Sequence, residues 1–223
     1  MMHYRLALVL TKLGDAAGAI HEWERAIELL PHRSGSYESL GMIYVQTGRG
    51  GEAEKYFQQA IALDPESAGG LNGLGMAYTS EKKYAGAVRC YEQALRFNPP
   101  YTVGLRLNLA FALEQLGRNE AAERQYDEVL KLEPENLMAL VNLGALLLQQ
   151  GKSAEALAVM EKAVKSHPLA ANARLGLGLA LEKQSRLPEA LAQFQETLRL
   201  DANNAVAKRH VERLPSGQGD AGK

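Results

Sequence analysis

The chain has 223 residues, of which 46% are hydrophobic, so it has enough apolar side chains to form a core and is not disordered throughout. Its 25 basic and 26 acidic residues give a net charge of −1, and no basic cluster has the size that nucleic-acid binding requires. The single cysteine, Cys90, excludes an intrachain disulfide and favours a reducing, cytoplasmic compartment. No apolar run approaches the roughly 20 residues that span a bilayer, so we expect neither nucleic-acid binding nor membrane insertion.

One residue pattern recurs six times along the chain with a step of 34 residues, lengthened once to 35 at Pro99-Pro100. The predicted units, in chain order, are residues 1–33, 34–67, 68–102, 103–136, 137–170 and 171–204. Each has a small residue early in its first half, namely Ala7, Gly41, Gly75, Ala110, Gly144 or Gly178. Each has a large residue in its second half, namely Trp23, Phe57, Tyr91, Tyr126, Met160 or Phe194. Such a period predicts a stack of supersecondary units in which each unit contacts its neighbours.

The apolar spacing predicts two helices in every unit, joined by a short turn. We expect the small residue to let the second helix approach closely, and the large residue to fill the space between adjacent units. A glycine at the turn, as at Gly14, Gly48 and Gly117, and again at Gly151, suits the left-handed backbone that ends many helices. Lys82 and Ser185 replace this glycine in two units, and we expect those turns to close in another way.

The two ends of the array differ. Residues 204–214 are predicted to form a capping helix with a narrow apolar stripe, Ala207, Val211 and Leu214, and the composition of residues 215–223 predicts a disordered tail. The first unit begins almost at Met1, so no helix covers its outer side. Three interpretations stay open there: the edge is tolerated, the chain is a piece of a longer array, or the edge packs on another molecule.

The second unit carries the most complete version of the repeated pattern. It reads Tyr37, Leu40, Gly41, Tyr44, Ala53, Phe57, Ala60 and Pro65. This pattern resembles the signature of the tetratricopeptide repeat family. The resemblance implies an all-α fold, a right-handed α-α superhelix of six tetratricopeptide repeats with a C-terminal capping helix. It also implies a protein–protein interaction adaptor that is not an enzyme and needs no cofactor.

In this family the first helices line a concave groove, and the resemblance implies that a protein or peptide partner binds there. The predicted groove residues are Met42, Asn72, Met76, Thr79, Leu107, Asn108, Phe111, Val141, Asn142, Gln149, Leu175 and Leu179. Methionine adapts to varied partners, and amide side chains can both donate to and accept from a bound backbone. Asn108 and Asn142 also resemble the asparagine ladder of O-linked N-acetylglucosamine transferases, although Gly73 and Gly176 interrupt it. The alternative is that the apolar residues are packing residues and the amides are merely solvated.

Motifs that suggest catalysis have simpler explanations. Gly151-Lys152-Ser153 resembles the end of a phosphate-binding loop, but Leu146 stands where the first glycine is needed, and no strand precedes it. No histidine has zinc-site spacing to another histidine or to Cys90, which we expect to be a helix-surface or half-buried thiol. We therefore predict no catalytic residue, no metal and no cofactor.

Two other functions remain as alternatives to the adaptor. The chain could be a self-assembling scaffold, a homo-oligomer formed through the N-terminal edge of the first unit. It could instead be the targeting segment of a larger enzyme, such as a glycosyltransferase, whose catalytic part lies outside this sequence.

Overall fold

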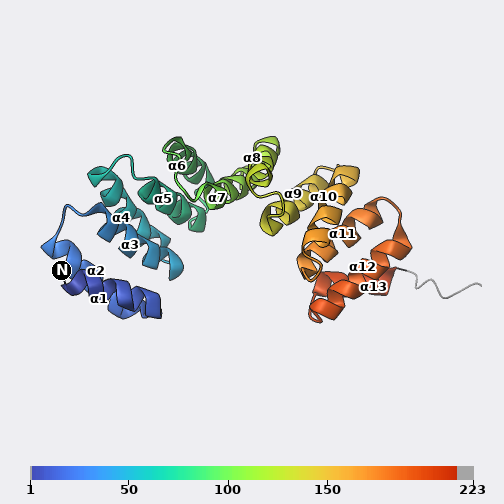
Figure 1. Ribbon diagram of the computed structural model, residues 1–223, viewed down its shortest axis with the longest axis horizontal. Helices are drawn as coiled ribbons and strands as arrows, with labels where there is room; N and C mark the ends of the chain where they lie inside the picture. Colours follow the sequence, from blue (N-terminus) through green and yellow to red (C-terminus); the bar gives the residue numbers. More distant parts are fainter. Residues whose placement is uncertain (1, 215–223) are drawn as a thin grey trace, which may run out of the picture. The chain divides into compact units, whose positions relative to one another are not determined.

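The computed structural model describes residues 2–214, and these residues form thirteen α-helices and no strand (Figure 1). The helices are α1 (Met2–Leu13), α2 (Ala16–Leu29), α3 (Ser34–Gln46), α4 (Gly50–Leu63), α5 (Ala68–Ser80), α6 (Tyr84–Arg96), α7 (Thr102–Gln115), α8 (Asn119–Leu132), α9 (Leu137–Gln149), α10 (Ser153–Ser166), α11 (Ala171–Lys183), α12 (Leu187–Leu200) and α13 (Ala205–Arg213). Six successive pairs, from α1–α2 to α11–α12, occupy the six predicted units, and only Thr102 at the start of α7 falls outside its unit.

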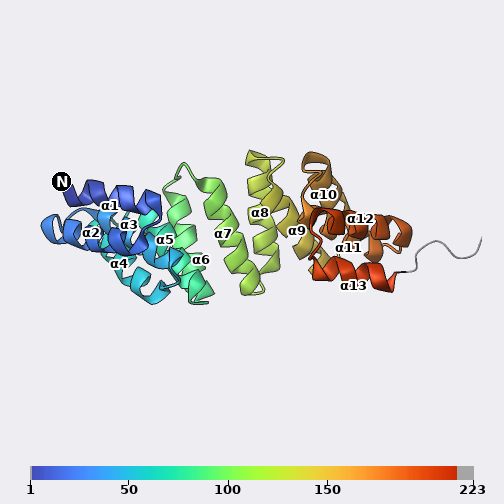
Figure 2. The ribbon, with the colours of Figure 1, turned by 90° about the horizontal axis from the view of Figure 1, so that it is seen from below.

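The chain divides into two compact units between Ala122 and Glu123, inside α8. In the first compact unit the helices α3, α5 and α7 contact one another in turn. The second helices α2, α4 and α6 each pack on the first helix of their own hairpin and on the first helix of the next hairpin. In the second compact unit α9 contacts α11, and α13 packs on α12. Figures 1 and 2 show the helices of each unit following one another in chain order. In both units, therefore, the first helices form a continuous layer.

The six large residues of the second helices belong to the buried core. All of them are at most 1% exposed: Trp23, Phe57, Tyr91, Tyr126, Met160 and Phe194. A Cβ atom would lie 2.9 Å from the Phe57 ring if added at Gly41 and 2.0 Å from it if added at Gly73, which belongs to the next hairpin. The prediction that the large residue fills the space between successive hairpins is confirmed for Phe57. The small residues Gly41, Gly75, Gly144 and Gly178 make room for the large side chain of their own second helix.

The turns between paired helices show where sequence reasoning failed. The four turn glycines have positive φ, from +70° to +77°, as predicted. Lys82 (φ 57°) and Ser185 (φ 61°) adopt the same left-handed conformation, so the prediction that their turns close differently is wrong. The backbone hydrogen bond from Lys83 N to Tyr78 O, 2.7 Å, corresponds to the 2.8 Å bond from Arg49 N to Tyr44 O in the preceding hairpin. The geometry of the hairpin thus overrides the roughly 1–2 kcal/mol preference of these residues for a right-handed backbone.

The two ends of the described chain differ in how they are covered. Asn204 caps the start of helix α13, and its side chain accepts a hydrogen bond from Ala207 N. Ala207 of α13 and Leu214 directly after it are buried. The predicted disordered tail, residues 215–223, lies outside the described residues. At the other end Met2 and Val9 of α1 are 75% and 52% exposed, and no helix among residues 2–214 covers them.

Candidate peptide-binding surface on the first helices

Seven of the predicted groove residues lie on the first helices of the first compact unit. We call the surface that these residues share with Leu8 of α1 the first-helix face: Met42 on α3, Asn72, Met76 and Thr79 on α5, and Leu107, Asn108 and Phe111 on α7. Leu8, Met42, Met76 and Phe111 hold the same register on successive helices, and α3, α5 and α7 touch in sequence. None of the seven is fully buried, and Phe111 is 43% exposed. The face therefore offers apolar surface in a row.

A cleft of about 270 Å³ opens on this face between α1 and α3. Leu8, Met42 and Gln46 line it, and Trp23 and Ile43 contribute buried apolar atoms. Glu38 also lines the cleft, and its carboxylate accepts a hydrogen bond of 2.6 Å from Ser67 Oγ. The sequence did not identify Trp23 and Ile43 as cleft residues, because large apolar residues at these positions of the repeat indicate core packing. The cleft is large enough for one apolar side chain of a partner.

Asn72 carries a buried acceptor that nothing in the described part of the chain satisfies. Its amide nitrogen lies 3.7 Å from Met76 Sδ, whereas its Oδ1 has no hydrogen-bond partner among residues 2–214. A buried polar atom without a partner costs about 1–3 kcal/mol. A partner that donates a hydrogen bond here would remove that cost, so Asn72 is the predicted amide best suited to binding.

Thr79 has a structural contact as well as a place on the face. Its hydroxyl donates to Gly75 O at 2.9 Å and lies 3.1 Å from Tyr91 Oη, and burial raises the pKa of Tyr91 to about 12. Thr11 makes the equivalent contact in the first hairpin, where Trp23 Nε1 donates to its hydroxyl at 3.2 Å. A threonine at this position of the first helix therefore provides a hydrogen-bond partner for the polar group of Trp23 or Tyr91 in the same hairpin.

Phe111 is the most exposed apolar residue of the row. Its ring meets the ring of Tyr84 edge to face, with centroids 6.3 Å apart, a contact that the sequence did not reveal. The neighbouring Asn108 is half-buried. Its equivalents Gly73 and Gly176 lie against Phe57 and Met160 of the preceding hairpins, where an added Cβ would meet those side chains at 2.0 and 2.4 Å. The asparagine-ladder positions thus lie at the seam between hairpins.

The other five predicted residues belong to the second compact unit. Val141, Asn142 and Gln149 lie on α9, and Leu175 and Leu179 lie on α11, which contacts α9. Gln149 is exposed and the others are half-buried. Leu175 and Leu179 pack on the cluster that includes Phe194. Part of their surface therefore serves the core, which the alternative interpretation anticipated.

Comparison with known proteins identifies the repeat. Residues 38–102, 107–166 and 144–205 match the family model described as tetratricopeptide repeat. The chain belongs to the tetratricopeptide repeat (TPR) family. The all-helical α-α solenoid with a C-terminal helix, predicted from the sequence, is likewise confirmed by the helices of the structure and by TPR structures of similar fold.

Solved structures share the TPR fold of this chain at low sequence identity. PilW, a type IV pilus biogenesis factor, is 18% identical, with 93% of this chain and 96% of PilW covered and a TM-score of 0.82. Pseudomonas aeruginosa pilF is 17% identical, with coverage of 93% and 94% and a TM-score of 0.78. YrrB, described as a TPR protein with an unusual peptide-binding site, is 20% identical, with coverage of 85% and 97% and a TM-score of 0.70. A comparison with curated proteins gives no match.

Residues 2–214 contain no group of three or more His, Cys, Asp or Glu side chains placed to hold a metal ion. Cys90 is buried rather than half-buried, and burial raises the pKa of its thiol to about 11. His167 Nε2 lies 2.6 Å from the carbonyl oxygen of Glu135. No helix in residues 2–214 is long and apolar enough to cross a membrane.

Proposed function

We propose that this TPR protein is an adaptor that binds a peptide segment of a partner protein on its first-helix face. The observation that carries the proposal is the row Leu8, Met42, Met76 and Phe111, which has one register and is incompletely buried on successive first helices. The TPR fold is that of a protein–protein interaction module. YrrB, which shares this fold, is described as having a peptide-binding site, and this supports a peptide as the occupant.

The chemistry of the face indicates what kind of peptide fits. The row presents adaptable methionines and one aromatic ring, which suit apolar anchor side chains. The cleft between α1 and α3 accepts one such anchor, and Asn72 Oδ1 accepts a hydrogen bond from the peptide backbone or from a polar side chain. An extended or helical segment with spaced apolar residues and a nearby donor satisfies both requirements.

The proposal can be tested with peptides selected from a random display library on the immobilised protein. Met76→Asp and Phe111→Asp each place a charge in the row, and we expect at least about tenfold weaker binding of a selected peptide because a buried charge has no partner. Fluorescence anisotropy measures the dissociation constant, and circular dichroism verifies that helical content is unchanged.

The matched control is Leu63→Asp, which makes the same chemical change at an exposed leucine on the second helix α4. We expect it to leave peptide affinity unchanged. If the Met76 and Phe111 variants bind as well as the wild type, or if the Leu63 variant alone loses affinity, the first-helix face is not the binding surface.

Self-assembly through α1 is a second candidate function, favoured by one observation. Met2, Leu6 and Val9 are exposed on α1, whereas their equivalents in the second hairpin, Ser36, Leu40 and Ile43, are buried. Sedimentation of the wild type and of a Leu6→Asp variant tests it. A dimer that dissociates on substitution supports self-assembly, and a wild type that stays monomeric at high concentration excludes it.

A further inference from the structure

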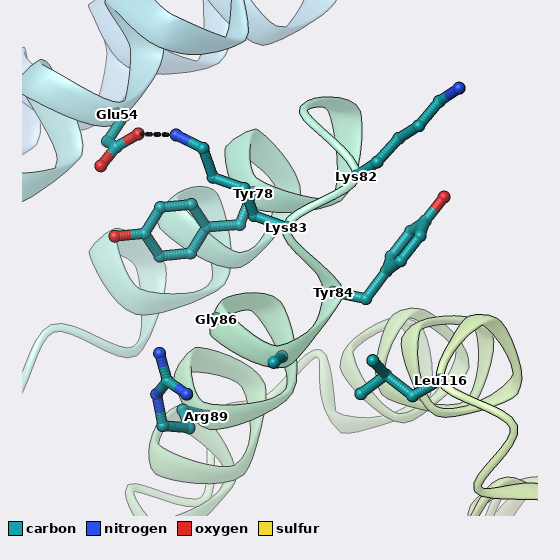
Figure 3. A pocket seen from close by; sticks show the side chains of 9 residues that line it. Glu54, Tyr78, Lys82, Lys83, Tyr84, Gly86, Arg89 and Leu116 are labelled. Atoms are coloured by element: carbon teal, nitrogen blue, oxygen red, sulfur yellow. Dashed lines mark hydrogen bonds and ion pairs between the residues drawn. The ribbon is translucent and has the colours of Figure 1, made fainter.

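A second pocket, whose lining includes none of the predicted groove residues, lies at the turn between α5 and α6 (Figure 3). It has a volume of about 460 Å³, and we call it the turn pocket. Its lining comes from three helices and two turns: Glu54 of α4, Tyr78 of α5, Tyr84 and Arg89 of α6, Lys82 and Lys83 between α5 and α6, and Leu116 directly after α7. All of these residues belong to the first compact unit.

The turn pocket is positively charged, although the chain as a whole has a net charge of −1. The one carboxylate in its lining, that of Glu54, is paired with Lys83 Nζ at 2.8 Å. Lys82 and Arg89 form no ion pair with any of residues 2–214, and both are exposed. Two cations are therefore available to an anionic partner.

Lys82 stands where the repeat calls for glycine. The equivalent turn residues include Gly48 and Gly117, and glycine adopts a positive φ without steric cost. Lys82 holds φ at +57°, a conformation that strains a side-chain-bearing residue. Strain kept in this way is often found at functional sites, and the exposed ammonium group at the pocket is the feature that glycine could not supply.

Aromatic and apolar groups form the rest of the wall. The Tyr78 ring lies beneath Lys83, with Nζ 5.6 Å from its centroid, and a Cβ atom at Gly86 would meet that ring at 2.9 Å. The Tyr84 ring is held by Phe111, and the Leu116 side chain is 40% exposed. The pocket can therefore take an apolar or aromatic side chain as well as negative charge.

The positions of the cations determine the kind of ligand. Figure 3 shows Lys82 and Tyr84 projecting to one side of the start of α6, with Arg89 on the opposite side. A single small anion cannot reach charges on both sides, whereas a peptide with spaced carboxylates can. We propose that the turn pocket binds an acidic peptide segment in which an aromatic side chain is flanked by carboxylates, at a site that shares no lining residue with the first-helix face and adjoins it where Tyr84 meets Phe111.

The experiment uses a fluorescein-labelled peptide, Glu-Glu-Glu-Trp-Glu-Glu-Glu, and a second probe with glycine in place of tryptophan. Fluorescence anisotropy at low salt gives the two dissociation constants for the full chain. We expect the tryptophan peptide to bind at least about threefold more tightly, because burying an aromatic ring adds to the charge interaction. We expect Lys82→Gly with Arg89→Gln to weaken its binding about tenfold, since both free cations are lost.

The matched control combines two substitutions. Ser185→Gly relieves the same backbone strain at a turn in the second compact unit, and Arg96→Gln removes an exposed cation outside the pocket. This variant should bind like the wild type. Equal loss in the control, no loss in the Lys82 and Arg89 variant, or equal affinity for the two peptides would overturn the proposal. So would displacement of the probe by an oligonucleotide of equal charge at a lower concentration than by unlabelled peptide.

Discussion

Replacing Gly73 with alanine adds one methyl group where the structure has no space for it. The Phe57 ring is fully buried between Gly41 of its own hairpin and Gly73 of the next. An added Cβ at Gly73 would lie 2.0, 2.3 and 2.5 Å from three atoms of this ring. On its other side the ring lies close to Gly41, where an added Cβ would lie 2.9 Å from it. The substitution must therefore displace either the ring or helix α5.

The expected cost follows from two opposing effects. Overpacking a core costs about 1–3 kcal/mol. Alanine in place of a helical glycine offsets about 0.5–1 kcal/mol of that. We expect the free energy of unfolding to fall by about 1 kcal/mol, the difference between the midpoints of these two ranges. Urea denaturation with circular dichroism as the signal measures it.

Two further variants make the measurement specific. Gly51→Ala, on helix α4 with no atom within 4 Å of the added Cβ, should raise the free energy of unfolding by about 0.5–1 kcal/mol. Phe57→Leu in the Gly73→Ala background should show a favourable coupling of at least about 0.5 kcal/mol, because the smaller side chain relieves the clash. If Gly73→Ala stabilises the protein as Gly51→Ala does, the packing of Phe57 between hairpins has been misjudged.

Three other predictions follow from single sites. Lys82→Gly and Ser185→Gly should each raise the free energy of unfolding by about 1 kcal/mol in urea denaturation, because glycine has no penalty at positive φ; a decrease would contradict the strain. Cys90 should not react with Ellman's reagent near about pH 8 until the protein unfolds, since burial raises its pKa to about 11; fast native reaction would refute this. Asn204→Ala removes the side-chain cap of α13 and should cost about 1 kcal/mol in the same assay, and an unchanged midpoint would show that the cap is unimportant.

The fold could be predicted from the sequence because the 34-residue period identifies the repeat. The large column, from Trp23 to Phe194, is buried as its pattern indicated, since packing between hairpins imposes the same residue type in each unit. The turns at Lys82 and Ser185 were predicted wrongly because residue preference was weighed there without the hydrogen bonds of the hairpin. Local preference is a weak guide where tertiary geometry fixes the backbone.

The candidate site was less predictable than the fold. Helical register alone places Met76 and Phe111 on one face, but the unpaired Asn72 Oδ1 depends on the surrounding side chains, which a sequence does not specify. The turn pocket is lined by residues of three successive hairpins, so no local sequence motif predicts it. The available signal was Lys82-Lys83 in a column where the neighbouring hairpins have glycine followed by one cation.

Site-specific photo-crosslinking tests the binding role of the first-helix face most directly. A photoreactive phenylalanine analogue placed at Phe111 should crosslink to a peptide selected from the display library, while the same analogue at Leu63 on α4 should not. Crosslinking from Leu63 with none from Phe111 would show that the partner binds a different surface of the TPR protein.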